Sequence, residues 1–183
     1  GLAGGFIAGH CVLRKTLDPS QPGAMTLFIR RYRPEDANAL AELFFHAVHV
    51  GAAHAYSPEE RAAWAPRPPR GPDWTTRLGD NVTLVADTAE GLRGFMTLTR
   101  DGYLDLAFVH PSTMGSGLAG MLYRALEAEA AFLGVACLST DASHPARVFF
   151  TKHGWATKSR QQVERNGITL TNFRMEKELT GAA

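Results

Sequence analysis

The sequence predicts a single α/β domain built on a mixed sheet, and three observations carry this prediction. Short runs of apolar and β-branched residues alternate with segments whose apolar residues recur at helical spacing. The 183 residues, 45% hydrophobic and 20% charged, are enough to bury one sizeable core. Neither a repeat nor a linker interrupts residues 25–183. We therefore expect one domain with about seven strands, three of them in an antiparallel meander, and about four flanking helices.

Residues 1–24 differ in composition from the rest of the chain, and we read them as an N-terminal extension. Their apolar run is far shorter than the ~20 residues of a membrane-spanning helix. Arg14 and Lys15 follow that run, whereas a secretory signal carries its positive charge ahead of it. An added remnant, an upstream start and a docking arm are all compatible with this segment. We predict that it carries no chemistry and that the protein does not contact a membrane.

The first strand is expected at residues 27–32, and two helix starts follow it. Pro34 opens a helix in which residues 40, 43, 44 and 48 form the apolar face. Ser57 and Pro58 are typical of the N-cap and first position of a second helix. The proline-rich stretch 65–72 cannot continue a helix, so we predict a stiff loop between Trp64 and Trp74.

The second half of the chain begins with the predicted meander and ends in a hairpin. Glycine-containing turns separate the three strands of the meander. A longer helix follows, ending just before Gly134. The remaining order is strand, helix, strand, a turn at Asn166-Gly167, and strand. The expected ranges are 81–86, 92–99 and 103–109 (meander), 117–132 (helix), 136–140 (strand), 145–153 (helix), 157–164 and 169–176 (hairpin).

A glycine-rich loop lies between the third meander strand and the longer helix. Such a loop presents unpaired backbone N–H groups and the positive end of the helix dipole, which together bind phosphate. Gly115, Gly117 and Gly120 also match the dinucleotide pattern G-x-G-x-x-G, and Asp141 ends the next strand as a ribose-binding acid would. Residues 110–114 intervene, however, and antiparallel strands precede the loop, which argues against a dinucleotide domain.

The surroundings of this loop carry a family resemblance. The run from Val109 through Pro111, Gly115 and Gly117 to Leu122 resembles the GNAT signature V-x-P-x-x-[QR]-G-x-G-x-[GA]-x-x-L. The segments HAYSPEE, YLDLAFV, LSTDAS, FFTKHGW and TNFRM are similar to a YafP-like branch of bacterial acetyltransferases. The resemblance implies the GNAT fold, acetyl-CoA as cosubstrate, a primary amine of a small molecule as acceptor, and direct attack in a ternary complex.

The resemblance also implies which residues hold acetyl-CoA. Backbone groups of Phe108 and Val109 would pair with the pantetheine arm, and the loop would hold the pyrophosphate. Three positions depart from the family pattern, because Met114 replaces Gln or Arg, Ser143 replaces Asn and Phe150 replaces Tyr. The implied cofactor residues are Phe108, Val109, Met114, Gly115, Ser116, Gly117, Leu118, Ala119, Gly120, Ser143 and Phe150.

Two residues on the strand before the loop are candidates for catalysis. An alkyl amine of pKa ~10.4 must lose a proton, which costs roughly 4–5 kcal/mol at pH 7, so a base is useful. Alternation places Tyr103 and Asp105 on one face of the strand, opposite Leu104 and Leu106. We expect Asp105 to be the base and Tyr103 the proton donor to the leaving thiolate. A structural salt bridge for Asp105 and core packing for Tyr103 are the alternatives.

Composition argues against several other functions. Nineteen Lys and Arg against eighteen Asp and Glu leave a net charge of +1, with no basic stripe for nucleic acid. Cys11 and Cys137 form neither a disulfide framework nor a zinc pattern, which favours a cytoplasmic setting. The histidines are scattered, so we expect no metal site. His46 and His49 lie where the resembled family has acceptor-pocket walls, or on a solvated helix face.

Two questions stay open at this point. Homodimers are common in the resembled family, so a homodimer is compatible with the sequence. The second concerns activity: Met114 and Phe150 favour an alternative in which the domain binds acyl-CoA as a sensor or partner-recognition module without turnover.

Overall fold

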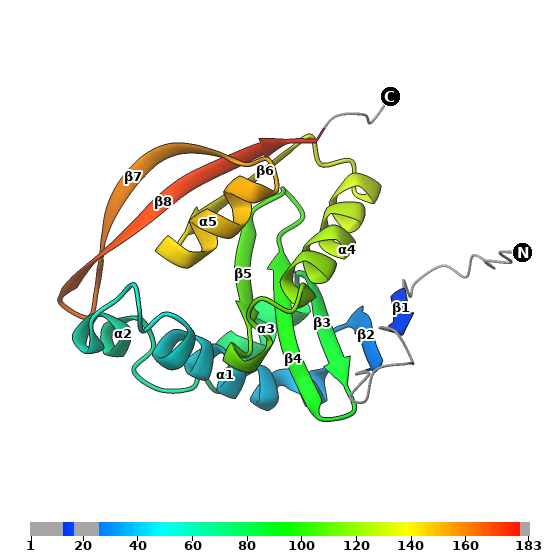
Figure 1. Cartoon of the computed structure of the whole chain (residues 1–183), viewed down its shortest axis with the longest axis horizontal. Helices are drawn as coiled ribbons and strands as arrows, with labels where there is room; N and C mark the ends of the chain where they lie inside the picture. The colour runs from blue at the N-terminus through cyan, green and yellow to red at the C-terminus, as the bar shows by residue number, and fades with distance from the viewer. Residues whose placement is uncertain (1–12, 17–25, 180–183) are drawn as a thin grey trace, which may run out of the picture.

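The computed structural model describes residues 13–16 and 26–179, and within them the chain forms two antiparallel sheets and five α-helices (Figure 1). The first sheet has the strand order β1-β2-β3-β4-β5, and the second has the order β6-β8-β7. No helix in the described part of the chain is both long and apolar enough to cross a membrane. The strands are β1 (Leu13–Thr16), β2 (Thr26–Arg31), β3 (Val82–Thr88), β4 (Gly91–Leu98), β5 (Leu104–Val109), β6 (Cys137–Ala142), β7 (Ala156–Arg165) and β8 (Ile168–Glu178).

The helices follow the predicted order with one addition. α2 begins with a capping box, in which the Ser57 side chain accepts from the Glu60 N–H and Glu60 accepts from the Ser57 N–H. α3 was not predicted, because it follows the proline-rich stretch and is only eight residues long. Pro72 occupies its first turn, where proline is tolerated. The helices are η1 (Pro34–Asp36), α1 (Ala37–His46), η2 (Ala47–Gly51), α2 (Pro58–Trp64), α3 (Pro72–Gly79), η3 (Pro111–Thr113), α4 (Leu118–Phe132) and α5 (His144–Lys152).

The predicted α/β class and the antiparallel meander are confirmed, and the structure changes the prediction of one continuous sheet. The expected single mixed sheet is two sheets, whose one parallel contact within the described residues is the bridge between Tyr103 and Ser139. Four residues of the expected N-terminal extension, Leu13–Thr16, pair with β2 as an edge strand. The rest of the extension, residues 1–12 and 17–24, lies outside the described residues.

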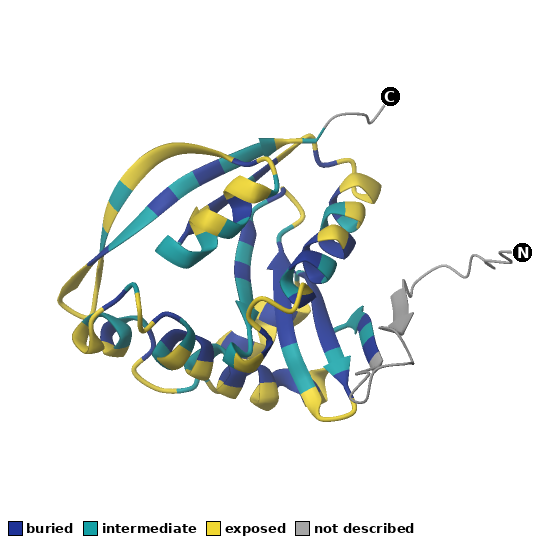
Figure 2. Ribbon diagram, viewed as in Figure 1, coloured by how far each residue is buried: buried dark blue, intermediate teal, exposed yellow. Residues whose placement is uncertain are grey.

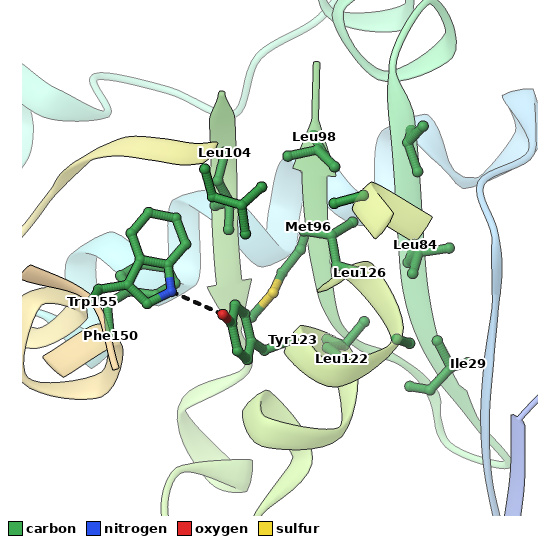
Figure 3. Close-up of a cluster of buried hydrophobic side chains, with 14 of the residues drawn as sticks. Ile29, Leu84, Met96, Leu98, Leu104, Leu122, Tyr123, Leu126, Phe150 and Trp155 are labelled. Atoms are coloured by element: carbon green, nitrogen blue, oxygen red, sulfur yellow. Dashed lines mark hydrogen bonds between the residues drawn. The ribbon is translucent and has the colours of Figure 1, made fainter. Parts of the chain in front are cut away.

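Apolar side chains cover both faces of the first sheet. On one face, α4 packs against β2, β3 and β4 through Leu118, Leu122 and Leu126, which are at most 3% exposed (Figure 3). On the other face, α1 packs against β4 and β5 and α3 packs against β3, with Leu40 and Trp74 in a second buried cluster. β3 and β4 are therefore mostly buried, whereas β7 is exposed along most of its length (Figure 2).

A bulge in β5 redirects the side chains beside the predicted site. Thr97 pairs with Leu106 and Leu98 pairs with Leu104, so Asp105 is an extra residue in β5. Leu104 consequently packs in the cluster under α4, while Leu106 packs in the cluster under α1 and α3. The prediction that Leu104 and Leu106 share a face is therefore wrong, because strict alternation fails at a bulge.

β5 and β6 touch at one end and then separate. Besides the Tyr103–Ser139 bridge, the Ser139 N–H donates to the Gly102 carbonyl at 3.0 Å and the Thr140 hydroxyl donates to the Leu104 carbonyl at 2.7 Å. Beyond these contacts the two strands form no further pairs in the described chain, and a cleft opens between them.

Candidate active site

A cleft of about 720 Å³ lies between the separated strands. Residues 104–108 of β5 form one side, and residues 140–143, at the end of β6 and the start of α5, form the other. Residues of α2 and of the β7–β8 hairpin also line the cleft. In Figure 1 these elements lie on the left of the molecule, away from α4. The volume is typical of a small-molecule site.

The glycine loop follows directly from the strand that lines this cleft. Gly115 and Gly117 have φ of +78° and +85°, a conformation that side chains rarely adopt. The backbone N–H groups of Gly115, Gly117, Ala119 and Gly120 donate to no acceptor among the described residues. A Cβ on Gly115 or Gly117 would meet no atom within 4 Å, so open space lies beside these amides. The loop can therefore take an anionic group.

Other predicted loop residues hold this conformation. The Ser116 hydroxyl donates to the Thr113 carbonyl at 2.5 Å and receives a weak bond from the Leu118 N–H at 3.4 Å. Leu118 is buried under the sheet and anchors the first turn of α4. Met114 is 52% exposed.

The free edge of β5 connects the loop to the centre of the cleft. Phe108 and Val109 pair with β4 on one side only, and no strand pairs with their other edge among the described residues. Val109 and Asp105 are four residues apart, which is ~13 Å along an extended strand. A ligand held by the glycine loop thus has an open strand edge leading toward Asp105.

Asp105 is held in an ion pair that the sequence did not reveal. Arg77 of α3 donates to both carboxylate oxygens, from Nε at 2.6 Å and from Nη2 at 2.8 Å. The Asp105 side chain is 18% exposed, and the hydrogen bond to it raises the pKa of Arg77. The structure thus shows the salt bridge that was the alternative to a base. Arg77 was missed because α3 was missed.

Tyr103 points its hydroxyl at a second carboxylate. The phenol donates to Asp141 Oδ2 at 3.0 Å, while Gln161 donates to Asp141 Oδ1 at 2.9 Å. Burial, followed by the charge of Asp141 and this hydrogen bond, raises the pKa of Tyr103 to about 12. Tyr103 lines the cleft, so it is not a core residue. The role of Asp141 beside Tyr103 could be read only once β5 and β6 were placed together.

The two predicted residues of α5 have mainly structural contacts. The Ser143 hydroxyl caps α5 by accepting from the Ala146 N–H at 3.3 Å. Phe150 is 1% exposed and packs against Tyr123 and Trp155 (Figure 3). Both residues also line the cleft, so each is in reach of a ligand there.

Further aromatic side chains line the cleft. Trp64 lies 5.4 Å from Tyr56 and 6.1 Å from Phe108, measured between ring centroids. Tyr56 is fixed because it donates to the Thr171 carbonyl and accepts from the His144 N–H, both at 3.0 Å. Trp74, at the other end of the proline-rich stretch, is buried and donates to the Ala37 carbonyl.

His46 and His49, for which an acceptor-pocket wall and a solvated helix face were both considered, lie away from the cleft. His49 contacts the Ala65 carbonyl at 2.7 Å, and His46 packs on His110 with 5.0 Å between the ring centroids. Neither residue lines the cleft. His46 is exposed, which agrees with the alternative of a solvated helix face.

Comparison with known proteins places this arrangement among acetyltransferases. Residues 52–178 match the family described as acetyltransferase (GNAT) domain. The chain is 33% identical over 150 residues to the uncharacterized N-acetyltransferase YafP of Escherichia coli, covering 80% of this chain and 93% of that protein.

Two solved structures share the fold. A GCN5-related N-acetyltransferase described as aminotransferase, class-II, from Rhodopseudomonas palustris is 35% identical, with a TM-score of 0.78 over 82% of this chain and 94% of that one. PaiA N-acetyltransferase from Thermoplasma acidophilum, solved in complex with coenzyme A, is 19% identical, with a TM-score of 0.66 over 85% of this chain and 100% of that one.

Proposed function

This chain belongs to the GNAT acetyltransferase family, and we propose that it transfers the acetyl group of acetyl-CoA to the primary amine of a small molecule. The observation that carries the proposal is the set of four unpaired loop amides at the end of a strand that lines a cleft of small-molecule size. Each half of the site is matched to one substrate, and the two halves meet near Asp105.

The glycine loop suits the pyrophosphate of acetyl-CoA. Four backbone N–H groups of the loop have no acceptor among the residues that the structure describes, and the dipole of the 15-residue helix α4 adds positive potential at its start. None of these contacts needs the side chain at position 114, so Met114 in place of Gln or Arg weakens binding without abolishing it. The free edge of β5 at Phe108 and Val109 would pair with the amides of the pantetheine arm, as a strand pairs with another strand.

The opposite end of the cleft suits a small amine with an apolar or aromatic body. Trp64, Tyr56 and Phe108 supply ring faces and edges. Asp105 and Asp141 already have charged or polar donors, so they do not present unpaired charge to a second ammonium group. Arg77 is likewise engaged and offers little to an acceptor carboxylate.

The reaction proceeds by direct attack of the neutral amine on the thioester carbon in a ternary complex. Expulsion of CoA as a thiolate is undemanding. A thiol has a pKa of ~8.5, so forming the thiolate at pH 7 costs only ~2 kcal/mol. Phe150 in place of a tyrosine is therefore compatible with turnover. The Arg77–Asp105 pair would form the polar wall beside the attacking amine, with Asp105 as one candidate to receive its proton.

Calorimetric titration with acetyl-CoA tests the cofactor half. Gly117→Glu places a carboxylate beside the free amides, and acetyl-CoA affinity should fall at least tenfold. Gly134→Glu is the matched control at the other end of α4, since Gly134 has φ of +73° and equally open surroundings. Unchanged affinity in Gly117→Glu would sink the assignment.

Release of free thiol from acetyl-CoA with a panel of primary amines tests the transfer itself. The proposal expects saturable, amine-dependent release. A module that binds acyl-CoA without turnover would release thiol only at the slow rate of hydrolysis, whichever amine is present.

A further inference from the structure

The two carboxylates on the cleft differ in what occupies their oxygens. Both oxygens of Asp105 accept from the planar fork of Arg77, in the bidentate geometry of a strong charge-assisted pair. Protonation of Asp105 would neutralise the carboxylate and remove the charge attraction that holds this pair together. Asp105 is therefore poorly placed to receive a proton while Arg77 remains in contact.

Tyr103 presents a different chemistry, because its only hydroxyl proton is already directed at Asp141 Oδ2. A phenol that donates to a carboxylate keeps its oxygen lone pairs available to a third group. Tyr103 lines the cleft, so that group can be a bound amine. Tyr103 is also a poor proton donor to the leaving thiolate. The pKa of Tyr103 is about 12, so the phenol is a weaker acid than the thiol that would be formed, whose pKa is ~8.5.

Asp141 is fixed in the position that this arrangement needs. Gln161 donates to Oδ1 at 2.9 Å, and Arg174 lies 3.5 Å from the same oxygen. Oδ2 is thereby left for Tyr103. The parallel bridge between Tyr103 and Ser139 holds the two strands together at this point. The Asp141 side chain is 32% exposed, so it can exchange a proton with solvent.

We infer that Tyr103 receives the proton of the attacking amine while it passes its own proton to Asp141, which acts as the positioning residue behind it. This inference rests on the proposed acetyl transfer. The amine nitrogen forms a bond to the thioester carbon, and the carbon–sulfur bond breaks to release CoA thiolate. The amine proton moves to the phenol oxygen, the phenol proton moves to Asp141 Oδ2, and Asp141 returns it to solvent.

The amine substrate loses two protons in the reaction, one before it attacks and one after the nitrogen has bonded to carbon. The relay through Tyr103 and Asp141 takes the second of these protons. An alkylammonium ion is a far weaker acid than a carboxylic acid, so a free ammonium group would not give its proton to a carboxylate. The first proton is therefore lost to solvent. Once the nitrogen bonds to carbon it becomes cationic and far more acidic, and transfer through Tyr103 is then favourable. The phenolate of Tyr103 is never formed as a free species.

Steady-state kinetics of the full chain test the relay, using the amine of the panel with the fastest thiol release. Tyr103→Phe and Asp141→Asn should each lower kcat by about 10² or more, with KM for the amine and the calorimetric acetyl-CoA affinity within threefold of wild type. The double variant should be no slower than the slower single variant, because the two residues act as one unit. Asp141→Glu should recover at least tenfold over Asp141→Asn. Tyr32→Phe, which removes a hydroxyl outside the cleft, is the matched control.

The outcomes separate the relay from the acetyl transfer on which it rests. Amine-dependent release by wild type with kcat retained in Tyr103→Phe overturns the relay alone. Loss in Tyr103→Phe but not in Asp141→Asn overturns the role of Asp141. Multiplying losses in the double variant overturn the coupling. No amine-dependent release by wild type overturns the acetyl transfer and the relay together. Melting curves show that each variant is folded, and a variant that fails to fold is replaced by Tyr103→Met or Asp141→Ser, with the same kcat criterion.

Discussion

A single methyl group added at Gly94 should disturb both stability and cofactor binding. Gly94 lies on β4 opposite Val109, the last residue of β5 before the glycine loop. A Cβ there would lie 2.9 Å from Leu118 Cδ2 and 2.9 Å from Leu122 Cδ1. Both leucines are at most 3% exposed, so they cannot swing into solvent. We therefore expect the added methyl group to push on the first turn of α4, which carries the free amides of Ala119 and Gly120.

The size of the effect follows from these contacts. Overpacking a buried site costs about 1–3 kcal/mol, and the loss of glycine freedom in the unfolded chain returns about 0.5–1 kcal/mol. Gly94→Ala should therefore lower the free energy of unfolding by about 1 kcal/mol and by no more than about 2.5 kcal/mol. For a domain of this size, 1 kcal/mol is a fall in Tm of about 2–4 °C. Acetyl-CoA affinity should fall as well, because the loop amides shift with α4.

Differential scanning calorimetry with a matched variant gives the assay. Gly79 ends α3, and a Cβ there would meet only Tyr32 Cε1 at 3.8 Å. Gly79→Ala should keep or raise the Tm and leave acetyl-CoA affinity unchanged. If Gly94→Ala melts as high as Gly79→Ala and binds acetyl-CoA normally, the close packing of α4 on β4 does not control the loop.

Three further predictions concern other contacts. Asp36 is 7% exposed; burial alone would raise its pKa, but hydrogen bonds from Arg30 and the Arg33 N–H lower it below the usual value. Its stabilisation is therefore present above pH ~4 and lost as pH falls through the folded pKa, so Asp36→Asn should cost about 2 kcal/mol at pH 7 in urea unfolding and less at pH 3. Tyr123→Phe should cost about 1–3 kcal/mol, seen as a lower urea midpoint, because the buried Trp155 Nε1–H loses its acceptor at 2.9 Å (Figure 3). Trp64→Ala should raise KM for an aromatic amine up to about tenfold while acetyl-CoA affinity stays constant, and an unchanged KM would remove Trp64 from the acceptor wall.

Sequence patterns that span only a few residues predicted most of the secondary structure and failed at two places. Turn residues, caps and apolar spacing located nearly every strand and helix from residue 26 onward, because each of these signals acts within a few residues. They failed at α3, where eight residues after a proline-rich stretch offer only Trp74 and Leu78 as a helical pattern. They also failed at the bulge in β5, because an extra residue in a strand appears only when its partner strand is aligned.

The sequence by itself determined the fold class, the glycine loop and the strand that leads to it, since unpaired amides at a helix start follow from local backbone geometry. Only the tertiary structure decided how the charged side chains are partnered. Arg77 meets Asp105 across 28 positions of the chain, and Tyr103 meets Asp141 across 38. A hydrogen bond depends on distances of about 3 Å between atoms, and no spacing in the sequence specifies such distances between separate strands and helices.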